Sequence, residues 1–119
     1  MKKSQMTVPL PRENMGIYPR SKLILQDIND PARRFETMLQ GRILIGRDAS
    51  QCQIVLRTDS TVARMQCEIY LLDGQIMLHN LSTTNITILN DQPVNEDCPL
   101  VCGSVISMGR VQLRVEVLQ

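Results

Sequence analysis

The sequence predicts an all-β domain, built as a sandwich of two mainly antiparallel sheets. Several segments alternate apolar and polar residues with a period of two, turn signals separate these segments, and no stretch sustains helical spacing. A chain of 119 residues fits one domain of this kind. About nine or ten short strands are expected, as in known β-sandwiches.

The chain begins with a segment that lacks strand patterning. Residues 1–20 contain three prolines, mixed charge and no periodicity, which predicts a flexible tail or linker before a domain at residues 21–119. The basic start at Lys2 and Lys3 is not followed by an apolar stretch, so we expect no secretory signal. No apolar run is long enough to span a bilayer.

The first half of the domain shows three strand-like segments. Phe35, Thr37 and Leu39 share one face of the earliest of them. The short continuous apolar runs at 43–45 and 54–56 predict strands that are buried on both faces.

The second half alternates more clearly. Apolar residues recur at every second position of 65–71, Asp73 and Gly74 then signal a tight turn, and the chain returns through 76–78. The last strand, 111–117, has the cleanest period of two. The predicted core residues come from these strands: Ile45, Ile54, Ile69, Leu78, Ile88, Ile106 and Leu113.

Charge and cysteine content exclude several classes of function. A net charge of +1 argues against a general nucleic-acid or membrane-surface binder. Cys52 and Cys67 lie in strand-like segments, which predicts unbridged packing residues in a reducing, cytoplasmic protein. Cys98 and Cys102 lack the second ligand pair that a zinc site needs, and His79 is the single histidine. We therefore expect no metal and no cofactor.

An enzyme is not expected either. The sequence shows no Cys–His or Ser–His spacing, no paired carboxylates in an obvious loop and no nucleotide-binding glycine motif. A binding module, in which loops of a rigid sandwich carry the function, fits the pattern better.

The loops contain five short motifs in a fixed order, at residues 46–47, 61–67, 80–87, 90–94 and 100–109. Together they resemble the motifs of the forkhead-associated (FHA) family, over about residues 22–118. The resemblance implies an FHA-like β-sandwich that binds proteins through phosphothreonine peptides. It also implies a site made of Arg47, Thr83, Thr84 and Asn85, in which Arg47 faces the phosphate and Asn85 holds the peptide main chain. A guanidinium fork, hydroxyls and loop N–H groups are the natural complement of a phosphate.

Five positions depart from the family pattern; Asp91 and Ser104 replace a turn Gly and an Asp near the end of the match, and the other three lie at the implied site. Ala63 replaces a phosphate-binding Ser, Gln66 replaces a His that braces the loops, and Ile86 replaces a Gly whose φ could be positive. Loss of one hydroxyl donor to a phosphate costs about 1.5–3 kcal/mol, or roughly ten- to a hundredfold in affinity. Arg64 follows Ala63 directly, and alternation predicts that its side chain points away from the phosphate.

Two interpretations therefore stay open. One is a phosphothreonine-peptide module with a weakened or altered phosphate site. The other is a degenerate FHA domain that binds without phosphate or has a structural role in a larger assembly. Arg47 could alternatively form a surface ion pair with Asp48 or Asp59. The polar residues at 83–85 could serve only as turn formers.

Overall fold

The computed structural model describes residues 21–118, which form eleven strands and no helix. The predicted tail at residues 1–20 lies outside these residues, so that prediction stays untested. The strands are β1 (Lys22–Asp27), β2 (Arg34–Met38), β3 (Ile43–Gly46), β4 (Ile54–Val55), β5 (Cys67–Leu72), β6 (Gln75–Asn80), β7 (Ile88–Leu89), β8 (Gln92–Pro93), β9 (Cys98–Pro99), β10 (Val105–Met108) and β11 (Val111–Leu118).

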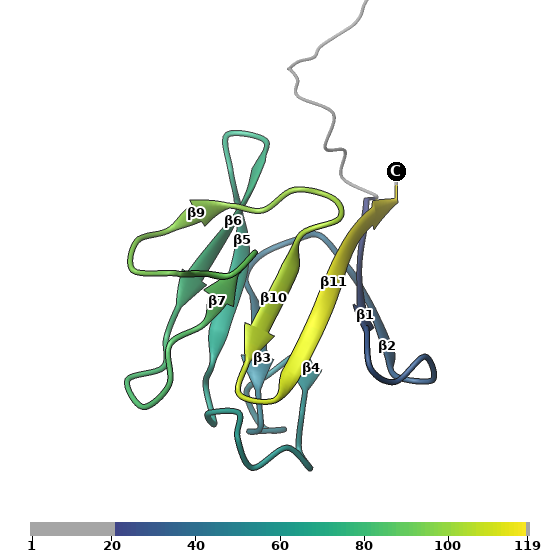
Figure 1. The fold of residues 1–119 in the computed structure, drawn as a ribbon. Coiled ribbons are helices and arrows are strands. Elements are labelled where there is room, and N and C mark those ends of the chain that lie inside the picture. Colours follow the sequence, from purple (N-terminus) through teal and green to yellow (C-terminus); the bar gives the residue numbers. More distant parts are fainter. Residues whose placement is uncertain (1–20, 119) are drawn as a thin grey trace, which may run out of the picture.

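The strands form two sheets that pack face to face (Figure 1). One has the order β2-β1-β11-β10-β7-β8, and the other has the order β4-β3-β5-β6-β9. All of the strand pairs are antiparallel except β3 and β4, which run parallel. The predicted sandwich of two mainly antiparallel sheets is confirmed.

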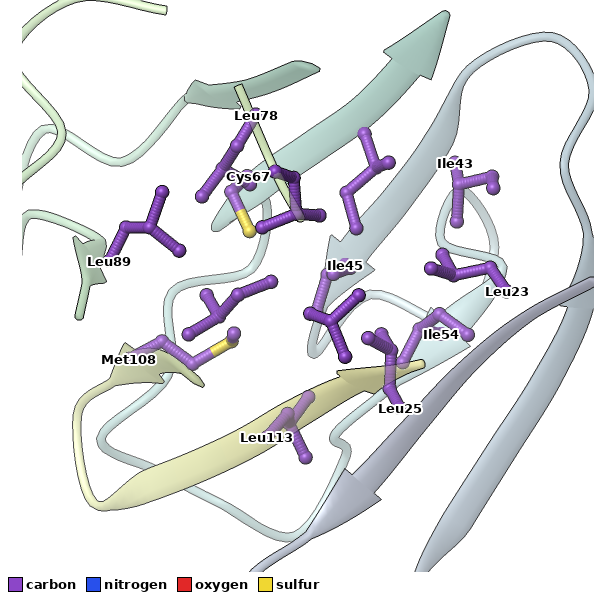
Figure 2. Close-up of a cluster of buried hydrophobic side chains, with 14 of the residues drawn as sticks. Leu23, Leu25, Ile43, Ile45, Ile54, Cys67, Leu78, Leu89, Met108 and Leu113 are labelled. Carbon is purple, nitrogen blue, oxygen red and sulfur yellow. The ribbon is translucent and has the colours of Figure 1, made fainter. Parts of the chain in front are cut away.

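The core lies between the two sheets. Because side chains alternate across a strand, every second residue of β1, β3, β5 and β11 points inward. Figure 2 shows these side chains, from both sheets, converging on one space. Six of the seven predicted core residues are buried there: Ile45, Ile54, Ile69, Leu78, Ile106 and Leu113.

The prediction for Ile88 is wrong. Ile88 is only half-buried, whereas its neighbours Thr87 and Leu89 are buried. With a period of two, Thr87 and Leu89 share the inner face of the chain and Ile88 must point outward. Polar Thr87 takes an inner position because its hydroxyl is hydrogen-bonded there, so hydrophobicity alone identified the wrong face.

The prediction that 43–45 and 54–56 are buried on both faces is also wrong. Leu44 and Val55 are half-exposed, while the residues on either side of each are buried. The five-stranded sheet is covered on its inner face by the other sheet, and no described element covers its outer face.

Two tight turns have left-handed backbone. Asp73 and Gly74 have φ values of 52° and 79°, as the predicted hairpin between β5 and β6 requires. Asn90 and Asp91 have φ values of 48° and 68° between β7 and β8. Asp and Asn tolerate this conformation because their short polar side chains bond locally. Within residues 21–118 no helix is long and apolar enough to cross a bilayer.

Candidate functional site

Three loops gather at one end of the sandwich, the lower end in Figure 1. They are residues 47–53 between β3 and β4, residues 56–66 between β4 and β5, and residues 81–87 between β6 and β7. Since β3, β5 and β6 are neighbours in one sheet, the ends of these strands bring the loops together. All four residues that the resemblance implied lie in them.

The first two loops are joined directly at the end of β3. The backbone N–H of Arg47 donates to the carbonyl of Ala63 at 3.2 Å, and that of Asp48 donates to the carbonyl of Arg64 at 3.2 Å. A Cβ on Gly46 would collide with the Arg64 carbonyl. Glycine at position 46 therefore permits the close approach on which the geometry of Arg47 depends.

The guanidinium of Arg47 is positioned but keeps free donors. Its Nε donates to the Val62 carbonyl at 2.5 Å, which fixes the side chain beside the second loop. No described residue forms an ion pair or another side-chain hydrogen bond with it. The two terminal nitrogens, which make the fork of a guanidinium, are thus available to an anion.

The two carboxylates considered as partners for Arg47 are engaged elsewhere. Asp48 lies 3.3 Å from the Arg64 guanidinium, and Asp59 lies 2.7 Å from that of Arg33. Hydrogen bonds from Ser50, with a smaller contribution from Arg64, lower the pKa of Asp48. Neither carboxylate forms the ion pair with Arg47 that was considered as an alternative. Arg64 instead pairs with Asp48, one residue along from Arg47.

The third loop is organised around Ser82. Its hydroxyl accepts from the N–H groups of Thr84 at 3.3 Å and Asn85 at 3.1 Å, and it donates to Asn85 Oδ1 at 2.9 Å. Thr84 Oγ1 also lies 3.3 Å from Asn85 Oδ1. Such Ser-centred bonding is typical turn chemistry. By contrast, Thr83 is exposed and its hydroxyl bonds no described residue.

Asn85 has a bracing role that the resemblance did not imply. Its Nδ2 donates to the Thr61 carbonyl at 2.9 Å, which ties the third loop to the second. Thr61 Oγ1 in turn accepts from the backbone of Arg110 at 2.9 Å, in the β10–β11 turn. Gly109 of that turn has no room for a Cβ against Thr61. The sequence analysis did not identify Thr61 as a residue of the site. Its position at the start of the 61–67 motif was the one sequence feature that could have indicated this role.

Gln66 braces the loops from beneath. It is fully buried, and its Oε1 accepts from the N–H of Ala63 at 2.9 Å. Its Nε2 donates to the Asn85 carbonyl at 3.0 Å and to Thr87 Oγ1 at 3.0 Å. One amide therefore holds the second and third loops together, the task that the resemblance assigned to a His at this position.

Ile86 causes no backbone strain. Positive φ values among the described non-glycine residues are confined to Asp73, Asn90 and Asp91. The conflict expected from replacing a Gly at position 86 does not arise, because the loop does not use left-handed backbone there.

The sandwich also carries four cysteines and a histidine that lies beside a carboxylate. All four cysteines are free thiols. Burial raises the pKa of Cys67 to about 12 and also raises that of Cys52, which disfavours the thiolates. His79 Nδ1 lies 2.6 Å from Asp97 on the outer face of β6. Among residues 21–118 no three His, Cys, Asp or Glu side chains are placed to share a metal ion.

The profile of the FHA domain family matches residues 43–109. No curated protein matches the chain. The FHA domain of FhaA, crystallised with the intracellular domain of Rv3910, is 30% identical with a TM-score of 0.69, covering 79% of this chain and 99% of that one.

Two further solved structures share the fold. One comes from an analysis of phosphothreonine-dependent FHA domain interactions; it is 29% identical with a TM-score of 0.70 and covers 80% of this chain and 95% of that one. The N-terminal FHA domain of S. cerevisiae Rad53p, solved with a phosphothreonine peptide, has a TM-score of 0.71 at 20% identity, covering 81% of this chain and 93% of that one.

Proposed function

The chain belongs to the forkhead-associated (FHA) domain family of protein interaction modules, and we propose that its loop end binds phosphothreonine peptides through a weakened phosphate site. The relatives support a protein partner, since their structures concern phosphothreonine-dependent interactions and a complex with an intracellular domain. The chemistry of the loops supports the same kind of ligand.

The observation that carries the proposal is the state of Arg47. Its Nε is anchored on Val62, no described residue bonds its terminal nitrogens, and the carboxylates of Asp48 and Asp59 form ion pairs with other arginines. A cation that is fixed in place and has no ion-pair partner among the described residues is prepared for an anion with several acceptor oxygens. The unbonded hydroxyl of Thr83 supplies a second donor.

The weakness of the site follows from Ala63. Its N–H is already bonded to Gln66, and its methyl group replaces a hydroxyl that would donate to the phosphate. Arg47 must then supply most of the charge complement. The missing bond corresponds to a loss of roughly ten- to a hundredfold in affinity.

The test is a titration with a degenerate phosphothreonine peptide library and its unphosphorylated twin. Binding of the phosphorylated library alone supports the proposal. Arg47→Ala should abolish that binding without unfolding the domain, and Arg47→Lys should restore only part of it, because an ammonium cannot reproduce the fork. Arg114→Ala, an exposed arginine on β11, is the control with the same change in charge.

A second variant tests the weakened site itself. Ala63→Ser should strengthen binding by about tenfold, the equivalent of ~1.5 kcal/mol for one hydrogen bond to a charged group. The measurement is the dissociation constant of the best phosphopeptide. An unchanged constant would show that position 63 does not contact the phosphate.

The second candidate is binding that does not need phosphate. Its support is Asn85, whose side chain is used on Thr61 and Ser82 rather than left free for a peptide. Equal binding of phosphorylated and plain peptides would establish this alternative.

The proposal also includes what the domain does not do. We infer a cytoplasmic, non-enzymatic domain without a metal, a cofactor, a nucleic-acid ligand or a membrane-inserted part. The net charge of +1 and the raised pKa values of the buried thiols support this part. Assays of the purified chain for nucleic-acid binding and for metal content test it directly.

A further inference from the structure

The six-stranded sheet has an unpaired edge at β2. This strand pairs only with β1, and no described strand lies on its other side (Figure 1). With five residues it is the longest edge strand of the two sheets, since β4, β8 and β9 have two residues each. A free edge presents N–H and C=O groups to which another strand can add.

The register with β1 fixes which groups face outward. The backbone N–H of Asp27, at the end of β1, donates to the Arg33 carbonyl at 2.9 Å. Hydrogen-bonded pairs alternate along an antiparallel ladder, so the residues two and four positions after Arg33 also direct their backbone groups to β1. The intervening residues, Arg34 and Glu36, direct their N–H and C=O groups to the open edge. Neither makes a backbone hydrogen bond outside its own sheet within residues 21–118.

We propose that β2 pairs antiparallel with β2 of a second copy of this chain, around a two-fold axis at Phe35. In that register Arg34 lies opposite Glu36 of the second copy, and Glu36 lies opposite its Arg34. The outward N–H and C=O groups of these residues then exchange four backbone hydrogen bonds. The two six-stranded sheets become one continuous sheet.

The charges on β2 favour this register over those in which the two-fold axis is shifted by one residue. Centring the axis on Glu36 would place the two Glu36 side chains directly opposite each other, and centring it on Arg34 would do the same with arginines. Like charges at directly opposed positions destabilise a strand pair, whereas opposite charges stabilise it. Only the axis at Phe35 gives two attractive pairs. The three-residue sequence Arg-Phe-Glu is thus self-complementary under two-fold symmetry.

Phe35 occupies the centre of the proposed contact. It packs partly against the core and stays half-buried at the edge of the sheet. In the proposed register it opposes its own copy at a non-hydrogen-bonded pair, where side chains approach most closely. Each ring would cover the exposed part of the other, a favourable aromatic contact.

The charges on β2 gain little within one chain. Glu36 lies 3.1 Å from Arg34 and 3.5 Å from Lys22, and these side chains are 43–51% exposed. Exposed pairs of this kind contribute little to stability. A second copy would add an opposed partner to each charge without breaking the pairs that exist. The competing explanation, that the charges only keep the edge solvated, predicts a monomer.

Analytical ultracentrifugation of the full 119-residue chain, from micromolar to millimolar concentration, tests the proposal. We expect a monomer–dimer equilibrium. Arg34→Glu or Glu36→Arg should each raise the dimer dissociation constant by at least about tenfold, and the double variant should restore it. Glu116→Arg is the matched control for Glu36→Arg. Glu116 is exposed on β11, so this substitution makes the same change in charge away from the edge strand. A chain that stays monomeric throughout, or a double variant that fails to recover, overturns the proposal.

A second measurement does not depend on charge. In a Cys102→Ser background, Phe35→Cys should form an intermolecular disulfide under mild oxidation, since directly opposed residues have the required spacing. Thr37→Cys should not, because its opposite residue is Arg33 of the second copy. Cross-linking of Thr37→Cys but not Phe35→Cys, with both variants folded by circular dichroism, would exclude the proposed register.

Discussion

Gln66 is the residue on which the loop end depends most. Its amide makes three hydrogen bonds of 2.9–3.0 Å, all inside the protein, to partners in two different loops. When a buried donor or acceptor loses its partner, the protein loses more folding free energy than the hydrogen bond contributed, because water cannot replace the partner. The network joins the second and third loops through protein groups alone.

Replacement of this amide by an apolar side chain of similar size should therefore be destabilising. Gln66→Met should lower the free energy of unfolding by about 3 kcal/mol, or the melting temperature by roughly 10–20 °C. Thermal unfolding followed by circular dichroism measures the effect. Gln75→Met, at the exposed first position of β6, is the control and should be nearly neutral; an equal loss there would refute the role of the network.

At the scale of elements, β3 meets the β4–β5 loop through Gly46. The Arg64 carbonyl occupies the space that a Cβ would need, so Gly46→Ala must push the two apart. We expect a loss of about 1–3 kcal/mol in urea unfolding, as for other overpacked sites. Because the shift displaces Arg47, peptide affinity should fall as well. A stable Gly46→Ala variant that binds normally would contradict this account.

Strand β9 is short, and the residue before it, Asp97, adds side-chain contacts to β5 and β6. It pairs with β6 at two positions, Met77 with Pro99 and Leu78 with Cys98. Asp97 accepts hydrogen bonds from the Tyr70 hydroxyl and from the His79 ring, its Nδ1 at 2.6 Å. These contacts, the Tyr70 bond first, lower the pKa of Asp97 below its ordinary 3.8, and Asp97 in turn raises the pKa of Tyr70 above its ordinary 10.0.

The two shifts predict losses of stability at opposite ends of the pH scale. The lowered pKa of Asp97 contributes stability that is complete above pH 3.8 and is lost as the pH falls through the folded-state value. The raised pKa of Tyr70 contributes stability below pH 10.0 that is lost as the pH rises further. The melting temperature of Asp97→Asn should therefore fall less than that of wild type at both acidic and alkaline pH. Asp91→Asn, in an exposed turn, should parallel wild type.

At the scale of the whole molecule, the two sheets hold together through one core. Leu113 on β11 is fully buried in it, whereas Leu118 on the same strand is 51% exposed. Leu113→Ala should lower the free energy of unfolding by about 2–5 kcal/mol, a large fraction of what a domain of this size has. Leu118→Ala should stay within about 0.5 kcal/mol of wild type. Urea unfolding of both variants measures these free energies. Similar losses of stability in the two variants would mean that burial does not explain the effect of Leu113→Ala.

The sequence by itself determined the sheets and most of the core. Alternation is a local property, so the inner faces of β5, β6 and β11 and the turn at Asp73 followed from a few neighbouring residues each. It failed at Ile88, where two adjacent apolar residues in a two-residue strand leave the period undefined. The resemblance located the loops that meet at the candidate site, including Arg47.

Only the tertiary structure decided what those loop residues do. The bonds of Arg47 to Val62, Gln66 to Asn85 and Asn85 to Thr61 join residues 15, 19 and 24 positions apart. No local pattern encodes such partners, because they depend on how strands from one sheet end beside each other. For the same reason the free guanidinium of Arg47 and the inward amide of Asn85 could be assigned only after the sheets had brought the three loops into contact.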